Sequence, residues 1–198
     1  PFNENRIIVV YRDDGEYGND GQVVCGTIAA DGNSVSWGTI VEWHAYYLDA
    51  FSIAWDPGTE NSFMITGAVR GTGTAYHEAR AGTVSGTTIT LGSAVDLSFA
   101  GARDNPQMLH GAFNPAQAGQ YISVNCNFNN YTTYRNIDFK VLTVSGTTIT
   151  HVSSAMIINE NCTNPVISWD ATDNQGYIFA GGNTNYPSVW PCQCLEIL

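Results

Sequence analysis

The carboxylates are the residues of this sequence that come nearest to a known catalytic chemistry. A glycoside hydrolase needs two of them on opposite sides of the bond that it cuts. The candidates to line the mouth of a ring of strands are Asp13, Asp14, Asp56, Glu78 and Asp170. Their spacing along the chain does not show that any two of them converge. We therefore assign no catalytic residue and predict a protein that is not an enzyme, with a glycoside hydrolase kept as the last alternative.

The same acidic side chains include candidate calcium ligands, and each of them has a simpler structural role. Asp56, Asn114 and Asp170 each follow an aromatic residue and open a polar turn, where such side chains bond to the backbone of the turn itself. Residues 13–20 have the acidic composition of a calcium loop, but they lack the ligand spacing and the terminal Glu of an EF-hand. We predict turn capping at these positions, with no metal site and no cofactor.

The histidines and serines form no known catalytic or metal-binding motif. The four histidines are spread along the chain without an H-x-H or H-E-x-x-H cluster, at His44, His77, His110 and His151. Ser85-Gly86 lacks the G-x-S-x-G context of a nucleophile elbow. Solitary histidines of the surface or core and serines of hairpin turns are the interpretation that these patterns favour.

The cysteines do not define the cellular compartment. Cys25 and Cys126 lie in apolar or alternating runs, and we predict that they are small buried side chains. Cys162 could form a disulfide bond with Cys192 or Cys194 in an oxidising compartment, but the odd number of cysteines prevents full pairing. The C-x-C pair lacks the second clustered pair that a zinc site needs.

Aromatic residues in polar, Asn-rich or loop-like segments are the candidate ligand-binding residues. Sugar rings stack on exposed aromatic faces, while neighbouring Asn, Asp and Gly residues supply hydrogen bonds. The alternative is that these rings fill space between sheets. The candidates are Trp43, Tyr46, Tyr47, Tyr131, Tyr134, Tyr186 and Trp190. Asn130 and Asn161 each begin a glycosylation sequon, which has meaning only in a eukaryotic-type secretory route.

Charge excludes two classes of partner. The 198 residues include 7 basic and 18 acidic side chains, which gives a formal net charge of −11. Such a surface repels phosphate backbones and anionic membranes, so we expect neither nucleic-acid binding nor membrane insertion. No apolar run approaches the roughly 20 residues that a membrane helix needs. The start without Met and the apolar finish predict a processed or partial chain.

An identical octapeptide, TVSGTTIT, occurs at residues 83–90 and again at 143–150. A looser copy runs from Thr27 to Gly38. Each copy reads as a strand, a tight turn containing Gly, and a second strand, which predicts a β-hairpin. Between the hairpins a second motif recurs, in which a strand ends at an aromatic residue, Asp or Asn opens a turn, and another strand follows. We therefore predict a repeat protein.

One repeat contains four short strands, predicted in the second unit at 51–55, 62–69, 75–84 and 87–97. Four strands per unit, repeated at about 40 to 60 residues, predict an all-β fold of the β-propeller type with antiparallel four-stranded blades. Because one blade cannot cover its own faces, neighbouring blades must stack on it.

The chain is predicted to be one domain of about three and a half blades with about fourteen strands. The first unit begins at the second strand of a blade, and the last ends at the third. The unit boundaries are about 1–47, 48–102, 103–160 and 161–198.

The recurring pattern resembles repeats of large structural proteins of marine bacteriophages, notably cyanophages, and of related uncultured viruses. The resemblance is carried by GTVSGTTITLGSAV at 82–95, IIVVYRD at 7–13 and SIAWDP at 52–57. It covers essentially the whole chain, as a pattern rather than an identity. It implies tandem blades and a virion-surface or tail-fibre role, and it transfers no active-site residue.

Two non-enzymatic functions follow as expectations. The first is a structural and adhesion module of a virion or an extracellular appendage that binds other protein subunits or a host-surface glycan. The second is a secreted carbohydrate-binding lectin, which should carry the same polar and aromatic set in every unit. Because residues 71–74 (GTGT) and 129–132 (NNYT) differ, we favour the assembly role.

Overall fold

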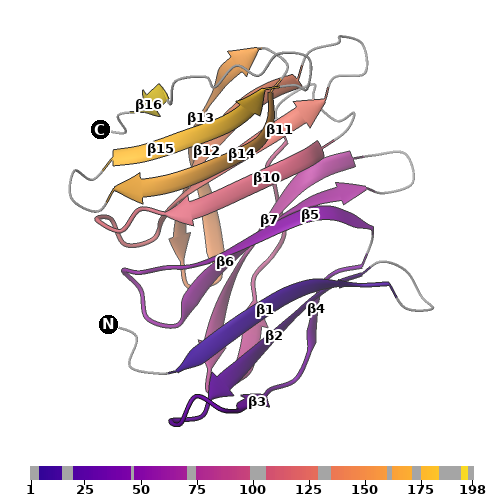
Figure 1. The fold of residues 1–198 in the computed structure, drawn as a ribbon, viewed down its shortest axis with the longest axis vertical. Helices are drawn as coiled ribbons and strands as arrows, with labels where there is room; N and C mark the ends of the chain where they lie inside the picture. Colours follow the sequence, from indigo (N-terminus) through magenta and orange to yellow (C-terminus); the bar gives the residue numbers. More distant parts are fainter. Residues whose placement is uncertain are drawn as a thin grey trace.

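The computed structural model describes residues 5–14, 20–45, 47–70, 75–98, 106–128, 135–159, 162–170, 175–182 and 193–195. Within these residues every regular element is a β-strand and every strand pairing is antiparallel, so the all-β prediction is confirmed. The strands form four sheets that follow one another along the chain (Figure 1). No helix in the described part is long and apolar enough to cross a membrane.

The sheets are numbered here in chain order. Sheet 1 contains β1 (Arg6–Asp13), β2 (Asp20–Ile28), β3 (Val35–Trp37) and β4 (Val41–His44). Sheet 2 contains β5 (Leu48–Trp55), β6 (Ser62–Arg70), β7 (Ala75–Ser85), β8 (Thr88–Leu91) and β9 (Val95–Asp96). Sheet 3 contains β10 (Pro106–Phe113), β11 (Gln120–Phe128), β12 (Arg135–Ser145) and β13 (Thr148–Asn159). Sheet 4 contains β14 (Cys162–Asp170), β15 (Gln175–Gly182) and β16 (Gln193–Leu195).

Sheet 1 repeats the second, third and fourth strands of sheet 2. In both sheets one long strand, β2 or β7, pairs with a long strand on one side and with two short strands on the other. The registers agree as well, because Arg6 pairs with Thr27 as Ser62 pairs with Thr83. Sheet 1 therefore begins at the second strand of the unit, as the sequence predicts.

The fourth strand of the unit is where the structure departs from the prediction. Residues 87–97 were expected to form one strand, but they form β8 and β9 with a break at 92–94. In sheet 3 the corresponding strand β13 is continuous, with two irregularities in its register. The cause lies in packing between sheets, because Gly92 sits against Thr147 of the next unit, as described below.

Three apolar clusters fill the spaces between successive sheets. The alternation of β6 shows how the sequence achieves this, since Phe63 and Ile65 face sheet 1 while Met64 faces sheet 3. A third cluster around Val124 and Phe139 receives Ile167 from sheet 4. Each inner sheet thus buries both of its faces. This stacking lends the fold its stability, because a lone sheet would leave one apolar face in water.

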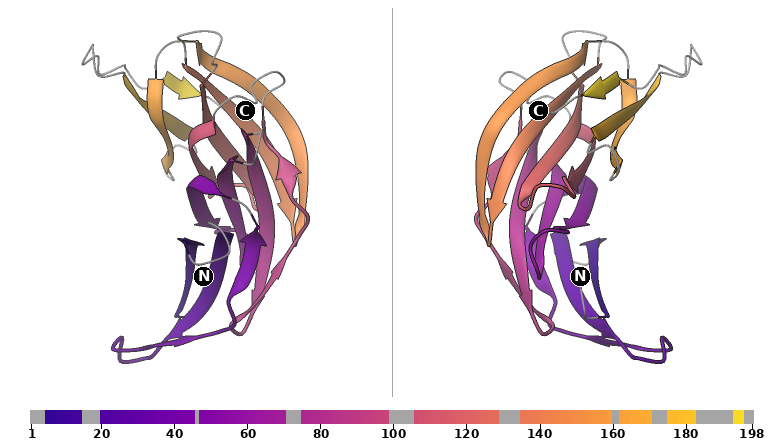
Figure 2. Two further views of the ribbon diagram at one scale, coloured as in Figure 1. Left: turned by 90° about the vertical axis from the view of Figure 1, so that its right-hand side faces the viewer. Right: turned by 90° about the vertical axis from the view of Figure 1, so that its left-hand side faces the viewer.

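The stack of sheets is curved, with β12 and β13 on its convex side (Figure 2). The antiparallel strands give the stack two ends. The first is here called the hairpin end and consists of the turns at 29–34, 56–61, 86–87, 114–119 and 146–147. The opposite end is called the connection end. There β1, β6 and β4 end and the strands that follow them, β2, β7 and β5, begin.

The hairpins predicted from the octapeptides are present at the hairpin end. Gly86 and Gly146 have φ values of 60° and 58°, each at the first position of a two-residue turn. A positive φ at that position is typical of a type II′ turn, which suits the twist of the flanking strands and favours glycine.

The octapeptide turns also join one sheet to the next. A Cβ atom on Gly38 would overlap Thr87, and one on Gly92 would overlap Thr147. The two glycines are equivalent, since their N–H groups donate to the carbonyl oxygens of Cys25 in β2 and Ala81 in β7, both at 2.9 Å. Close contact between successive units is therefore a repeated feature of the hairpin end.

Candidate functional site

The candidate aromatic residues that the structure describes are Trp43, in β4, and Tyr47, immediately before β5. Trp43 is buried, with 1% of its surface exposed, and its indole occupies the space above Gly21 and Gly67. Tyr47 is 39% exposed. The other predicted binding residues and the asparagines of both glycosylation sequons lie outside the described residues: Tyr46, Tyr131, Tyr134, Tyr186, Trp190, Asn130 and Asn161.

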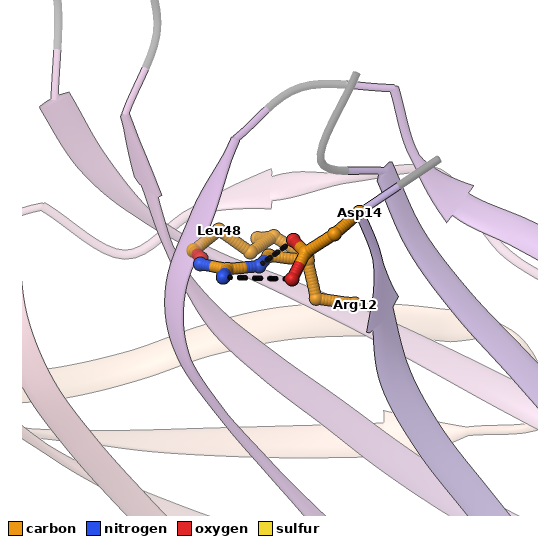
Figure 3. Close-up of polar contacts among 3 residues, drawn as sticks. All are labelled: Arg12, Asp14 and Leu48. Carbon is orange, nitrogen blue, oxygen red and sulfur yellow. Dashed lines mark hydrogen bonds and ion pairs between the residues drawn. The ribbon is translucent and has the colours of Figure 1, made fainter. Parts of the chain in front are cut away.

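Arg12, at the connection end of β1, contacts both Asp14 and the backbone of Leu48 (Figure 3). Its guanidinium makes a bidentate pair with Asp14, with Nε at 2.6 Å from Oδ1 and Nη2 at 3.3 Å from Oδ2. Nη1 donates to the carbonyl oxygen of Leu48 at 3.0 Å, which ties β1 to the start of β5. The guanidinium carbon lies 4.9 Å from the centre of the Tyr47 ring, within range of a cation–π interaction.

The arrangement fixes the charge and the position of Arg12. The hydrogen bond to Asp14 raises the pKa of Arg12 above its ordinary value, so the side chain is a permanent cation. Asp14 remains largely exposed at 63% of its side-chain surface. The surface therefore offers a held guanidinium, an accessible carboxylate and a half-exposed aromatic ring. These are groups that bind hydroxyl-rich or charged ligands.

A second polar chain lies next to Asp14, on the face of sheet 1 that points away from sheet 2. The hydroxyl of Tyr11 donates to Gln22 Oε1 at 2.7 Å, and Gln22 Nε2 donates to Asp13 Oδ2 at 3.0 Å. Both bonds cross from β1 to β2. Asp13 and Asp14 thus each accept a hydrogen bond from a neighbouring side chain.

A charged cluster is buried behind this surface, between sheets 1 and 2. Glu78 of β7 lies 3.3 Å from Nδ1 of His44 and accepts a bond of 2.9 Å from Nε of Arg80. The Tyr76 hydroxyl donates to the same carboxylate at 3.4 Å. Burial by itself raises the pKa of Glu78, but the bonds from His44 and Arg80 outweigh it and lower the pKa.

The lowered pKa has a chemical consequence. A general acid for glycoside hydrolysis needs a carboxyl group with a raised pKa, so that it keeps its proton near neutral pH. Glu78 is held in the opposite state, as a carboxylate paired with the Arg80 guanidinium and hydrogen-bonded to His44. Its role is therefore structural, since it pairs with Arg80 within β7 and its contact with His44 joins β7 to β4.

The turn residues at the hairpin end cap the backbone. Asp56 Oδ1 accepts from the N–H of Gly58 at 2.8 Å, and Asn114 Oδ1 accepts from Ala116 at 2.9 Å. Asp56 does more, because its Oδ2 accepts from the N–H of Gly119 in the next unit at 3.0 Å. The predicted turn capping is thus observed at Asp56 and Asn114. The side chain of Asp170 lies outside the described atoms.

The histidines lie in separate environments. His77 is fully buried, and burial lowers its pKa to about 3, with Asp96 opposing and Lys140 adding to the shift. His110 accepts a bond from the N–H of Ile167 at 3.3 Å, and burial lowers its pKa. Among the residues described, no group of three His, Cys, Asp or Glu side chains could hold a metal ion.

The described cysteines behave as small apolar residues. Cys25 and Cys126 are buried, as predicted, and burial raises the pKa of the Cys25 thiol. The side chains of Cys162, Cys192 and Cys194 lie outside the described part of the structure.

Sequence reasoning missed Arg12, Arg80 and the pairing of His44 with Glu78. Only one signal pointed to them, namely that charged residues are scarce in this chain, at 13% of all residues. A charged side chain in an alternating strand of such a chain is expected to pair with an opposite charge, but the sequence does not identify that residue.

No protein-family model matches the sequence, and a search of curated proteins finds no match for it.

Proposed function

We propose that the chain is a segment of a β-propeller-type repeat that serves assembly and adhesion on a virion or an extracellular appendage, without catalysing a reaction. The main support for this proposal is the outer face of sheet 1, which points away from sheet 2. This face has the apolar pattern of the faces that are covered elsewhere in the stack, and no described element covers it.

The residues of this face occupy the same positions in sheet 1 as buried residues do in sheet 2. By strand register, Ile7 and Val9 of β1 correspond to Phe63 and Ile65 of β6. Likewise Val35 and Trp37 of β3 correspond to Ile89 and Leu91 of β8. In sheet 2 these four residues pack against sheet 1. Their four equivalents in sheet 1 face no other sheet within the described structure.

The exposure of this face indicates a surface that another sheet would cover. Trp37 is 52% exposed, whereas Leu91 at the same position packs against the core between sheets 1 and 2. Covering such a face removes apolar area from water at roughly 25 cal/mol per Å², which is the driving force of most protein association. We infer that a further sheet of the same repeat type stacks there, supplied by another subunit of the assembly.

Adhesion belongs to the connection end in this proposal. The Arg12, Asp14 and Tyr47 surface supports it, because a held guanidinium, a carboxylate and an exposed ring can bind a host-surface glycan. The net charge of −11 supports the expectation that nucleic acid is not a partner.

The mass of the native particle, measured by light scattering on protein purified from its source, tests the assembly role. A particle of many chains is the expected result, and a single-chain mass overturns the proposal. Trp37→Glu should then reduce the assembly, because it places a carboxylate in the covered face. Ser36→Glu is the matched control, since Ser36 is exposed on the opposite face of β3, and it should leave the mass unchanged.

A secreted lectin is the second candidate, favoured by the Arg12, Asp14 and Tyr47 surface alone. A single-chain mass together with binding on a glycan array would place this function first. Loss of that binding in Tyr47→Ala would locate the glycan at the connection end.

A further inference from the structure

The strand β1 differs from its equivalents in the other sheets by its pairing. β6 pairs with β5 on one side and β7 on the other, and β11 pairs with β10 and β12. Among the described strands β1 pairs with β2 alone. We propose that the second edge of β1 binds an extended peptide segment in which a small residue is followed by an aromatic residue and then by Asp or Asn. This inference rests on the proposed assembly function and names the contact that begins it.

The first strands of the other units define the segment. Their small residues are Ala54, Ala112 and Ser168, their aromatic residues are Trp55, Phe113 and Trp169, and their acidic or amide residues are Asp56, Asn114 and Asp170.

These strands also define the register. Trp55 pairs with Phe63 and Phe113 pairs with Tyr121, so the aromatic residue always lies opposite the same position of the second strand. The paired rings meet edge to face, with centroids 5.9 and 5.0 Å apart.

β1 offers the corresponding apolar surface. Its Ile7 is equivalent to Phe63, so the incoming aromatic ring would lie over Ile7. The ring of Trp37 lies close by, because it packs over Gly26, the partner of Ile7 in β2. An aromatic residue in the bound segment would therefore bury the half-exposed Trp37 together with Ile7. This continues the type of contact that Trp55 and Phe63 make in sheet 2.

Charge selects the residue that follows the aromatic one. In sheet 2 the backbone of Asp56 bonds to the carbonyl oxygen of Ser62 at 2.9 Å, which places Asp56 opposite Ser62. The residue of β1 at that position is Arg6. A bound Asp would consequently face a guanidinium. Arg6 already reaches the turn of the next unit, where Nη1 donates to Oδ1 of Asn61 at 2.6 Å.

The turn beyond adds a second attraction for Asp. Asp56 accepts a bond from Gly119 of the following unit, a residue with a φ of 73°. Asn61 has the equivalent place in sheet 2, with a φ of 60°. The carboxylate of a bound segment would thus meet Arg6 and the turn at Asn61 together, as Asp56 meets the turn at Gly119. Edge-strand addition of this kind takes affinity from main-chain bonds and specificity from alternate side chains.

A peptide taken from the chain itself tests the proposal. A fluorescein-labelled peptide of residues 48–60 is titrated with the full chain, and its anisotropy should rise to saturation. We expect Trp55→Asp in the peptide to weaken binding at least tenfold and Asp56→Lys to weaken it several-fold. Glu60→Gln, near the end of the turn, is the control and should bind as the parent peptide does. Because the changes are in the peptide, folding of the protein is not at issue.

Cross-linking then determines the register in which the peptide pairs with β1. A photoreactive benzoylphenylalanine replaces Trp55 in the peptide, and trypsin cuts the protein after Arg6 and Arg12. The cross-link should map to the fragment 7–12 or to Trp37. Absence of saturable binding, equal binding by the Trp55→Asp peptide, or cross-links to other sheets would overturn the proposal.

The two proposals fail separately. A native particle of many chains with no peptide binding would reject the strand contact alone. A single-chain mass with peptide binding at β1 would uphold the strand contact and reject assembly.

Discussion

The hairpin end and the connection end of the stack differ in how far their contacts repeat from one unit to the next. At the hairpin end the same contact occurs twice, between Gly38 and Thr87 and between Gly92 and Thr147. At the connection end, equivalent positions carry different side chains in each unit. The register places Gln22, Glu78 and Asp138 at one such position.

These three residues make unrelated contacts. Gln22 bonds to Tyr11 and Asp13, Glu78 binds His44 and Arg80, and Asp138 accepts a bond of 3.4 Å from Asn125 in its own sheet. The hairpin end therefore repeats one contact between neighbouring sheets, whereas the contacts at the connection end differ from unit to unit.

The largest effect is expected from filling the contact at Gly92. Gly92→Val places a branched side chain against the backbone of Thr147, so sheets 2 and 3 must separate locally or the turn must shift. We expect a loss of about 3 kcal/mol in the free energy of unfolding, at the upper end for overpacking. Urea denaturation followed by fluorescence measures it.

Val152 supplies the matched control, because it occupies the position 60 residues after Gly92 and is exposed. Val152→Ala should change the stability by no more than about 0.5 kcal/mol. An unchanged stability in Gly92→Val would show that the hairpin end does not hold the sheets together, and the contrast between the two ends would be lost.

Breaking the buried ion pair at the connection end comes next. Glu78→Gln keeps the shape but leaves Arg80 without a carboxylate, which should cost about 2 kcal/mol because Arg80 stays partly hydrated. The exposed Glu42→Gln is the comparison and should be nearly neutral.

Acid unfolding sharpens this prediction. The folded pKa of Glu78 lies below its ordinary value of 4.5, so its stabilisation is present above pH 4.5 and is lost as the pH falls through the folded pKa. Glu78→Gln should therefore lose less stability than the parent protein on acidification below pH 4.5. A parallel loss in the two proteins would contradict the assigned pairing.

The hairpin end was largely predictable from the sequence, and the reason is that its determinants are local. TVSGTTIT specifies a turn through the glycine of positive φ and the two strands through alternation, so both hairpins are found where expected. The break in the strand at 92–94 was not predictable, because it depends on Thr147 in another sheet.

The connection end was predictable only in part. Tyr47 was expected at a surface and is exposed there, but Trp43 was a candidate from the same segment and is buried. Trp43 fills space left by two glycines, Gly21 and Gly67, that are distant in sequence but both lie against its ring in the fold. The pairing of Arg12 with Asp14 needed only a bend after β1, whereas that of His44 with Glu78 needed the stacking of two sheets. Sequence periodicity identifies the faces of strands, but it does not say which faces meet.

A smaller effect is expected from His77, the buried histidine of β7. Its pKa is about 3 in the folded protein against 6.5 when unfolded, so between these values only the unfolded state takes up the proton. Stability should therefore fall as the pH decreases below 6.5, by about 1.4 kcal/mol at pH 5.5 relative to the plateau above neutral pH.

His77→Gln should lack this slope, whereas His151→Gln, at an exposed position, should keep it. Unfolding in urea at pH 7.5, 6.5 and 5.5 provides the comparison. An identical slope in His77→Gln would mean that this side chain is hydrated in the folded state.

The smallest effect on stability is expected at Tyr47. A substitution there distinguishes the role of the connection end from that of the hairpin end most clearly. Tyr47→Ala removes an exposed ring and its contact with Arg12, which should cost about 0.5 kcal/mol of unfolding free energy. If the connection end binds glycan, the same change should weaken binding to a positive glycan on an array at least tenfold. Gly38→Ala should behave in the opposite way, with reduced stability and unchanged glycan binding, because Gly38 contacts Thr87 at the far end of the strands. Loss of binding in both variants would mean that the two ends are coupled, since a change in stacking would then reach the surface around Arg12.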